Sequence, residues 1–414
     1  MDRPNNNSFC ILPFIHLYAE PKGEMKPCCI ASGFDEPLNL KKSSIDDAFN
    51  SPQMKELRKD MMNGTRNKVC DVCYKREDAT EHSPRLNFNE NKLWELPKIS
   101  DDYSVESQFQ HIDIRFSNLC NFKCRMCNHD FSSNWFEDTL KIRPHNPTTK
   151  ILKVTDTISQ DLKPHLSKVK SVYFAGGEPL IMPEHYDTLK YLYESIPLES
   201  MKDTNGNSIT TRNLSIHYNT NLSVLKYDEQ NLIDLWKGFY KVMLSISCDG
   251  IGEVGEYQRT GFSTKRFEDN LRIIKKHAKP INVFTHKTGI SYNFQYTTTI
   301  MNIYHIFDFI DYMLNEGHIT DSDQIDFYYS WAPLEYSLSQ LPIVEKQKVV
   351  DFLNKKINNY SNKTQDELNR IIDFVNSDVK TYDYELSDEL KLEYIKKIDE
   401  LHGGNFEEIS KIIL

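Results

Sequence analysis

The sequence predicts an α/β fold built around one sheet of parallel strands. Between about residues 109 and 300, short apolar runs of strand length alternate with longer segments of helical period. Strands and helices that alternate in this way are joined by right-handed crossovers, which make the strands parallel. The chain has 414 residues, of which 39% are hydrophobic and 12% aromatic, so it can bury a large core.

A small cysteine-rich α+β domain is expected over residues 1–90. Residues 9–30 are typical of two short strands around a turn at residues 21–23. Residues 43–64 are typical of one helix, and Gly64 is its expected stop.

A polar connection over residues 83–105 leads to the βα series, expected over residues 105–315. In this connection Arg85 and Asn87 are expected to be solvated surface. The expected strands are residues 109–117, 169–179, 213–221, 240–250 and 289–300, and the expected helices are residues 184–196, 266–279 and 304–317. Residues 316–414 begin with one more strand-like piece, 324–332, and then form a mostly helical extension.

Charge and hydropathy exclude several classes of protein. The net charge of −10 argues against a nucleic-acid surface, because phosphate binding needs concentrated positive charge. The first residues, MDRPNNNSFC, lack the apolar run of a secretory signal. Nowhere do eighteen consecutive apolar residues occur, so no membrane partner is expected. The sequence therefore predicts a soluble, cytoplasmic protein.

Eight of the nine cysteines form two groups, which in a reducing compartment favours metal ligation over disulfides. The stretch NLCNFKCRMCNHD places Cys120, Cys124 and Cys127 in the pattern C-x3-C-x2-C. Three thiolates can hold three corners of a [4Fe–4S] cluster and leave one iron open for a small molecule. A zinc knuckle that adds His129 as a fourth ligand is the alternative.

This motif, placed directly after the first strand of a βα series, resembles that of the radical S-adenosylmethionine (SAM) superfamily. The resemblance implies a partial (β/α)6 TIM-like barrel whose three-cysteine cluster binds SAM. One electron from the cluster then cleaves SAM to methionine and a 5′-deoxyadenosyl radical, which abstracts hydrogen from a substrate. Catalytic function is thereby assigned to Cys120, Cys124 and Cys127.

The same resemblance implies a set of SAM contacts at later strand ends. The turn FAGGEP resembles the one that binds the amino group of SAM, with Glu178 helping. HYNTN and LSISCDG resemble the strand ends that meet the ribose hydroxyls, and Arg259 is expected to pair with the methionine carboxylate. Met126 stands where the family often has an aromatic residue against adenine, which leaves that contact open. The expected contacts are Met126, Gly176, Gly177, Glu178, Pro179, Asn219, Asn221, Ser247, Asp249 and Arg259.

The N-terminal cysteines resemble a twitch or SPASM auxiliary-cluster domain. Cys10, Cys28, Cys70 and Cys73 are the expected ligands of a second [4Fe–4S] cluster, and Cys29 is expected to be a spare, buried thiol. Four cysteines in two halves also suit zinc, so the metal stays open. In most relatives this domain follows the barrel, whereas here it precedes it, so its distance and role cannot be carried over.

The sequence thus predicts a radical SAM oxidoreductase or modifying enzyme whose auxiliary cluster accepts or relays electrons. The expected substrate is a small molecule, such as an amino sugar or alcohol, or a peptide side chain. The expected electron donor is a reductase, flavodoxin or ferredoxin. The rival prediction is a zinc-stabilised binding module without radical chemistry. Cys248, alone at a strand end, is expected to serve packing.

Overall fold

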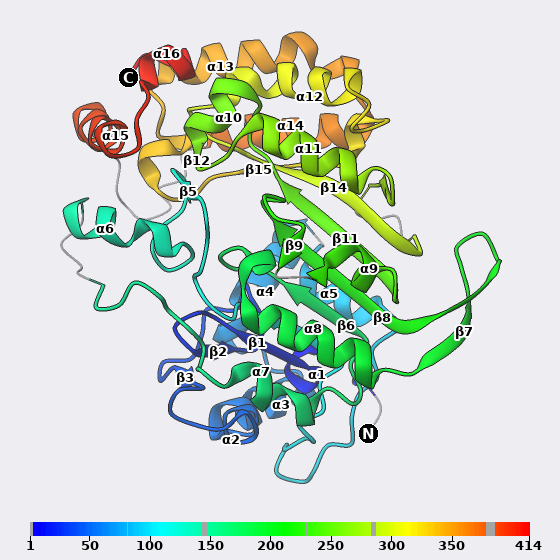
Figure 1. Cartoon of the computed structure of the whole chain (residues 1–414). Helices are drawn as coiled ribbons and strands as arrows, with labels where there is room; N and C mark the ends of the chain where they lie inside the picture. The colour runs from blue at the N-terminus through cyan, green and yellow to red at the C-terminus, as the bar shows by residue number, and fades with distance from the viewer. Residues whose placement is uncertain (1–2, 81, 143–146, 228–229, 283–286, 378–385) are drawn as a thin grey trace.

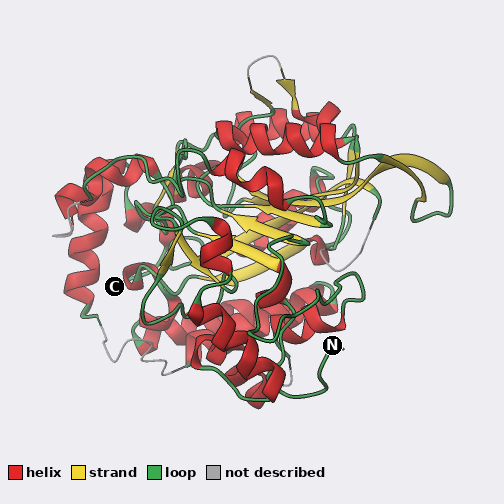
Figure 2. Cartoon of the chain, turned by 90° about the horizontal axis from the view of Figure 1, so that it is seen from below, coloured by secondary structure: helices red, strands yellow, loops and turns green. Residues whose placement is uncertain are grey.

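One large mixed sheet runs through the molecule, with helices on both sides of it (Figures 1 and 2). The computed structural model describes residues 3–80, 82–142, 147–227, 230–282, 287–377 and 386–414. Within that part of the chain no helix combines the length and the apolar composition that crossing a membrane requires.

Six parallel strands follow one another across the sheet in chain order, which confirms the predicted partial (β/α)6 TIM-like barrel. The pairing register places Ile112, Val172 and Ile216 side by side on the first three. The six are β4 (His111–Ile114), β6 (Ser171–Phe174), β8 (Ser208–Thr220), β11 (Phe239–Ser247), β14 (Gly289–Thr298) and β15 (Ile325–Tyr329).

The N-terminal region continues this sheet. β1 (His16–Ala19) pairs in parallel with β4, and β2 (Glu24–Lys26) and β3 (Leu38–Asn39) extend the sheet in antiparallel fashion. The predicted turn between the first two strands is present, since the amide of Gly23 donates to the carbonyl of Glu20 over 2.7 Å. The cysteine-rich region is therefore joined to the barrel by backbone hydrogen bonds.

The remaining strands are short or peripheral. β7 (Leu198–Lys202) and the first half of β8 form a hairpin arm that projects from the body (Figure 1). β13 (Ala278–Pro280) pairs with the start of β14. Two small ribbons are formed by β5 (Lys123–Cys124) with β12 (Arg259–Thr260), and by β9 (Lys226–Tyr227) with β10 (Gln230–Asn231).

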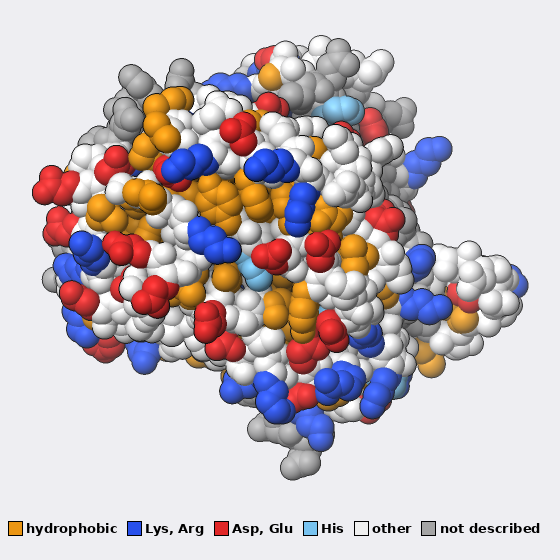
Figure 3. Space-filling view, turned by 90° about the horizontal axis from the view of Figure 1, so that it is seen from above, with side chains coloured by type: hydrophobic (Ala, Val, Ile, Leu, Met, Phe, Trp, Pro, Cys, Tyr) orange, Lys and Arg blue, Asp and Glu red, His pale blue; other side chains and the backbone are white. Residues whose placement is uncertain are grey.

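Helices cover the sheet, and further helices form most of the N-terminal region and of the C-terminal extension. In the N-terminal region they are α1 (Leu12–Ile15), α2 (Ile45–Phe49), α3 (Pro52–Asn63), α4 (Asp71–Thr80) and α5 (Pro84–Glu90). In the barrel they are α6 (Phe136–Ile142), α7 (Ile158–Leu162), α8 (Pro183–Ser195), α9 (Leu232–Trp236), α10 (Gly252–Gln258), α11 (Thr264–Ile274) and α12 (Ile306–Asn315). The extension holds α13 (Ile343–Lys356), α14 (Asn362–Asn376), α15 (Asp388–His402) and α16 (Phe406–Ser410). Figure 3 shows the face above these last helices, where hydrophobic side chains are interspersed with charged ones.

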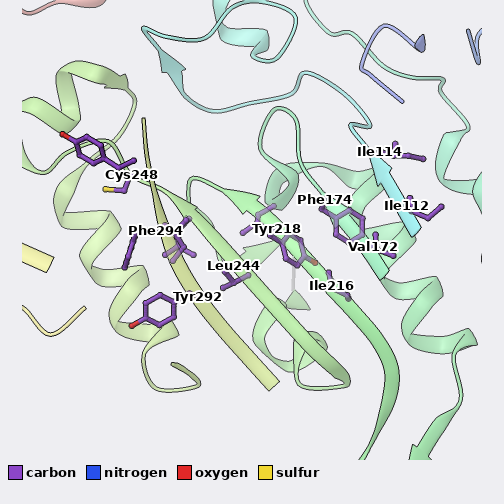
Figure 4. Close-up of a cluster of buried hydrophobic side chains, with 14 of the residues drawn as sticks. Ile112, Ile114, Val172, Phe174, Ile216, Tyr218, Leu244, Cys248, Tyr292 and Phe294 are labelled. Atoms are coloured by element: carbon purple, nitrogen blue, oxygen red, sulfur yellow. The ribbon is translucent and has the colours of Figure 1, made fainter. Parts of the chain in front are cut away.

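Strand periodicity sorts the side chains onto two faces of the sheet. Apolar residues such as Val172, Ile216 and Leu244 form the buried layer beneath the helices (Figure 4). On that face the ring of His185 on α8 packs edge-on against Phe174, with 4.7 Å between centroids. The alternate residues therefore face the inside of the curved sheet.

Four features differ from the sequence prediction. One is that the helix expected over residues 266–279 ends at Ile274, and Ala278–Pro280 form β13 instead. The single helix expected over residues 43–64 is two helices, because Ser51 caps a new helix that begins at Pro52. The predicted stop at Gly64 is confirmed, with φ +81°. The polar connection contains α5, and β15 lies beyond the expected boundary at residue 315 although it pairs with β14.

The apolar layer makes a direct prediction about stability. Leu244 is 0% exposed in β11, so Leu244→Ala should lower the free energy of unfolding by about 2–5 kcal/mol. Leu198→Ala is the matched control, since that side chain is 57% exposed, and its effect should stay within about 0.5 kcal/mol. Thermal or urea denaturation measures both, and equal effects would contradict this description of the core.

Candidate functional site

A cavity of about 470 Å³ opens at the carboxyl ends of the parallel strands, where ligands bind in sheets of this kind. The segments that meet there are the chain from the end of β4 through the three-cysteine loop, the glycine turn after β6, the ends of β8 and β11, and β12. The lining residues are Arg115, Cys120, Phe122, Cys124, Met126, Cys127, Asn128, Phe131, Ser132, Ala175, Gly176, Gly177, Glu178, Asn219, Thr220, Asn221, Ser247 and Arg259.

The cavity brings together most of the residues predicted to bind SAM, but two stand outside its wall. Pro179 is buried at the start of a short 3-10 turn. Asp249 is fully buried, and its carboxylate accepts hydrogen bonds from Arg259 Nε at 2.6 Å and from the amide of Thr297 at 2.8 Å. Asp249 therefore lies where it orients Arg259.

The glycine turn lies directly against the cysteine loop. The amide of Glu178 donates to the carbonyl of Leu119 over 2.8 Å. Gly177 has φ +50°, and a Cβ at this position would lie 2.3 Å from that carbonyl oxygen. Only glycine allows this approach, so the GG pair of the sequence is explained by backbone contact as well as by conformation.

Glu178 fastens the turn to the end of β8. Its carboxylate accepts hydrogen bonds from Thr220 Oγ1 at 2.8 Å and from the amides of Leu180 and Asn221 at 3.0 and 2.7 Å. Burial raises the pKa of Glu178 to about 7, although these three hydrogen bonds oppose the shift. The loop and the strand end are linked in turn, because Asn221 Nδ2 donates to Asn121 Oδ1 at 3.0 Å.

Arg259 brings positive charge to the cysteine loop. β12 pairs with β5, which places Arg259 opposite Cys124, and the guanidinium Nη1 lies 3.8 Å from the Cys124 sulfur. Burial raises the pKa of all three loop thiols, while Arg259 opposes that shift at Cys124 and Cys127. Since thiolates are the ligating form, metal binding here would release protons.

The donor set of this cavity fits an iron–sulfur cluster with three protein ligands. Three cysteines from one loop line a space large enough for a cluster and a further molecule. Among the described residues no three His, Cys, Asp or Glu side chains converge on a point where a single metal ion would sit. His129, the fourth ligand of the alternative zinc knuckle, lies outside this cavity, and its Nε2 hydrogen bonds to the carbonyl of Lys150 at 3.0 Å.

The cysteine loop is also anchored from the far end of the chain. Arg125 is fully buried between Cys124 and Met126, and its Nη1 lies 2.7 Å from a carboxylate oxygen of Asp399 on α15. Its Nε donates to the carbonyl of Tyr257 at 2.7 Å. The C-terminal extension thus contacts the loop between two of its cysteines.

A second, smaller cavity of about 20 Å³ lies in the N-terminal region. Its wall contains all four predicted auxiliary ligands, Cys10, Cys28, Cys70 and Cys73, together with Leu12, Ile30, Ala31, Val72, Pro84 and Arg85. This donor set fits a cluster with a complete set of protein ligands. Burial raises the pKa of Cys10 and Cys70, and that of Cys28 to about 12.

Two predictions about this region are wrong. Cys29, expected to be buried, is exposed and does not line the cavity. Arg85, expected on the solvated surface, is 4% exposed and hydrogen bonds to Glu77 and to the carbonyl of Phe9. The sequence Ser83-Pro84 carried the signal that was missed, because a serine cap followed by proline begins a helix. Asn87 is exposed, as predicted.

The inner face of the sheet carries polar residues that the sequence analysis did not single out. His217 Nε2 and Ser245 Oγ are 2.8 Å apart, and Ser245 donates to Asn293 Oδ1 at 2.9 Å. Asn293 donates to Asp326, which also accepts from Lys363 Nζ at 2.6 Å. A hydrogen-bonded row thus crosses four strands and reaches α14.

Asp113 and Arg115, on β4 and just beyond it, lie on this face beside the cavity. Asp113 Oδ1 is buried and accepts no hydrogen bond in the described part of the chain, and it lies 3.9 Å from Arg115 Nε. Burial raises the pKa of Asp113 to about 6, against the effect of Arg115. Their alternation with Ile112 and Ile114 was the signal that could have found them. Cys248, by contrast, is 0% exposed within the apolar core (Figure 4), which suits packing.

Comparison with known proteins gives two family matches. The Radical SAM superfamily matches residues 114–295, and the SPASM family, an iron–sulfur cluster-binding domain, matches residues 10–74. No curated protein matches the chain.

Solved structures with a detectable likeness include anSMEcpe with bound AdoMet, at 16% identity and a TM-score of 0.36, which covers 59% of this chain and 60% of that one. SuiB from Streptococcus suis bound to S-adenosylmethionine is 13% identical with a TM-score of 0.34, over 74% of this chain and 62% of that one. The match therefore spans about 60% of the length of each relative, and at such TM-scores it carries no weight on substrate.

The two family matches contain all seven cysteines that line the two cavities, and they identify the chain as a member of the radical SAM superfamily that carries a SPASM-type iron–sulfur cluster-binding domain ahead of its barrel.

Proposed function

We propose that the chain binds SAM in the large cavity, cleaves it reductively to the 5′-deoxyadenosyl radical and abstracts hydrogen from a substrate. One observation carries the proposal: the three-cysteine loop, residues 119–127, and the glycine turn, residues 176–178, contact each other and line a single cavity. The cluster bound there would supply the electron and an open iron for SAM.

The residues of the cavity divide this task. Cys120, Cys124 and Cys127 hold the cluster. Backbone groups of Gly176 and Gly177 face the cavity without a side chain to block them, which suits an amino group of SAM.

Polar groups at the next strand ends suit the rest of the molecule. Asn219 Oδ1 is buried without a hydrogen-bond partner among the described residues, so it can accept from a ribose hydroxyl. Asn221 and Ser247 line the same cavity. Arg259, held by Asp249, presents charge for the carboxylate, and Met126 provides a polarizable contact for adenine.

The second cavity would hold an auxiliary [4Fe–4S] cluster on Cys10, Cys28, Cys70 and Cys73. With four protein ligands it has no open iron, so its use is to accept or relay electrons. The substrate would lie on the inner face of the sheet, where Asp113 Oδ1 accepts no hydrogen bond from the described residues. Such a face suits a polar reacting group, as in an amino sugar, an alcohol or a peptide side chain. A reductase, flavodoxin or ferredoxin would supply electrons.

The metal content of anaerobically reconstituted protein tests the proposal. About eight irons per chain with equal sulfide are expected, and replacing Cys120, Cys124 and Cys127 by alanine should remove about four. The same change should abolish formation of 5′-deoxyadenosine from SAM and dithionite. Zinc without iron, or cleavage of SAM by the triple variant, would contradict the proposal.

The contact between the glycine turn and the cysteine loop gives a second prediction. Gly177→Ala should weaken SAM binding to the reconstituted protein by about ten-fold or more, a change of about 1.4 kcal/mol, because the added methyl group displaces the turn. Gly206→Ala is the control: it has a similar positive φ, +84°, but open space around the Cβ position. Equilibrium dialysis with labelled SAM measures both, and equal losses would show that the contact is unimportant.

The ion pair between Arg125 and Asp399, which anchors the cysteine loop to the C-terminal extension, gives a third prediction. Asp399→Asn should lower the iron content by up to one cluster, about four irons, because it leaves the buried Arg125 charge without its counterion. Glu389→Gln removes an exposed carboxylate from the first turn of the same helix and should leave the iron content unchanged. Iron and protein assays on matched preparations decide the matter, and a full complement of iron in Asp399→Asn would refute the role of the anchor.

A further inference from the structure

We propose that the buried ion pair Arg85–Glu77 sets the reduction potential of the cluster in the N-terminal cavity, with Arg85 raising it and Glu77 lowering it. This inference rests on the proposed function in one respect, that Cys10, Cys28, Cys70 and Cys73 hold an iron–sulfur cluster.

Both charges of the pair are buried away from water. The side chains of Arg85 and Glu77 are only 5% and 9% exposed. Arg85 Nε donates to Glu77 Oε1 at 2.9 Å, and its Nη2 donates to the other carboxylate oxygen. Ser83 also donates to Glu77. Charges buried in this way act over longer range than surface charges, which water and salt screen.

The two charges are not equally placed with respect to the cysteines. Arg85 lines the same cavity as the four thiols, whereas Glu77 does not. The cluster would therefore lie nearer the positive end of the pair. One-electron reduction adds a negative charge to a cluster, so a positive charge beside it favours the reduced form and raises its potential.

Arg85 also positions one ligand directly. Its Nη1 donates to the carbonyl of Phe9 at 2.6 Å, next to Cys10. Asn89, one turn further along α5, donates to the same carbonyl at 2.7 Å and accepts from the amide of Ile11 at 2.9 Å. Arg85 could therefore act by positioning Cys10 or by setting the reduction potential of the cluster. Comparison of variants of Arg85 and Asn89 distinguishes the two roles.

The test is a redox titration, followed by electron paramagnetic resonance, of the full-length chain with Cys120, Cys124 and Cys127 replaced by alanine, so that only the N-terminal cluster remains. In this background Arg85→Gln should shift the midpoint potential to more negative values. Glu77→Gln, which keeps an acceptor for Arg85 but removes its counterion, should shift it to more positive values. Arg85→Lys should stay close to the parent.

Two controls complete the design. Asp78→Asn removes a negative charge from the same helix, but Asp78 is exposed and pairs with Arg66, so the potential should not move. Asn89→Ala loosens the Cys10 backbone without a change of charge, so it should reduce iron retention and leave the midpoint potential in place.

Opposite shifts for Arg85→Gln and Glu77→Gln, with unmoved controls, support the inference. Midpoint potentials that shift in the same direction in both variants, that do not shift, or that shift equally in Asn89→Ala would overturn the inference without contradicting the presence of the cluster. Iron and sulfide assays on the same samples show whether the auxiliary cluster is present at all. If the chain with Cys120, Cys124 and Cys127 replaced by alanine binds zinc or no metal, this inference falls together with the auxiliary cluster of the proposed function.

Discussion

The site depends on the way in which Glu178 ties three strand ends together. Its amide holds the carbonyl of Leu119 before the first cysteine, and its carboxylate holds Thr220 and Asn221 at the end of β8. These bonds form in the interior, where an unpaired carboxylate would be costly. Once they are made, the cysteine loop, the glycine turn and the strand end cannot move independently, and the cavity between them has a fixed shape.

The two cavities belong to one continuous sheet. β1 joins the cysteine-rich region to the barrel by parallel pairing with β4, so the unit that precedes the barrel in sequence is not suspended from a linker. This pairing fixes the distance between the two cysteine-lined cavities. Placing this region before the barrel changes the chain order but still allows a rigid link.

The sequence predicted those features that depend on residues close together in the chain. Alternation and glycine placement located the six parallel strands of the barrel and the turn at Gly177, and spacing located the cysteines that line both cavities. It failed where the cause is tertiary. Nothing local to Arg85 says that α4 and α5 fold over Cys10, and nothing in the Ser-Cys-Asp-Gly stretch says that Asp249 turns away from the cavity towards Arg259 and Thr297. The polar inner face had a visible pattern, but one strand alone does not reveal which of its two faces lies inside a curved sheet.

The bond between Arg125 and the C-terminal helix has a consequence for biosynthesis. Arg125 also donates to the carbonyl of Gly403, 278 residues later in the chain. During translation the barrel can assemble while those residues are still in the ribosome, since its strands are added in chain order. Arg125 in the cysteine loop, however, lacks its counterion Asp399 until α15 has emerged. The loop between Cys124 and Cys127 can therefore reach the arrangement described above only after the barrel strands, once Asp399 and Gly403 are part of the chain.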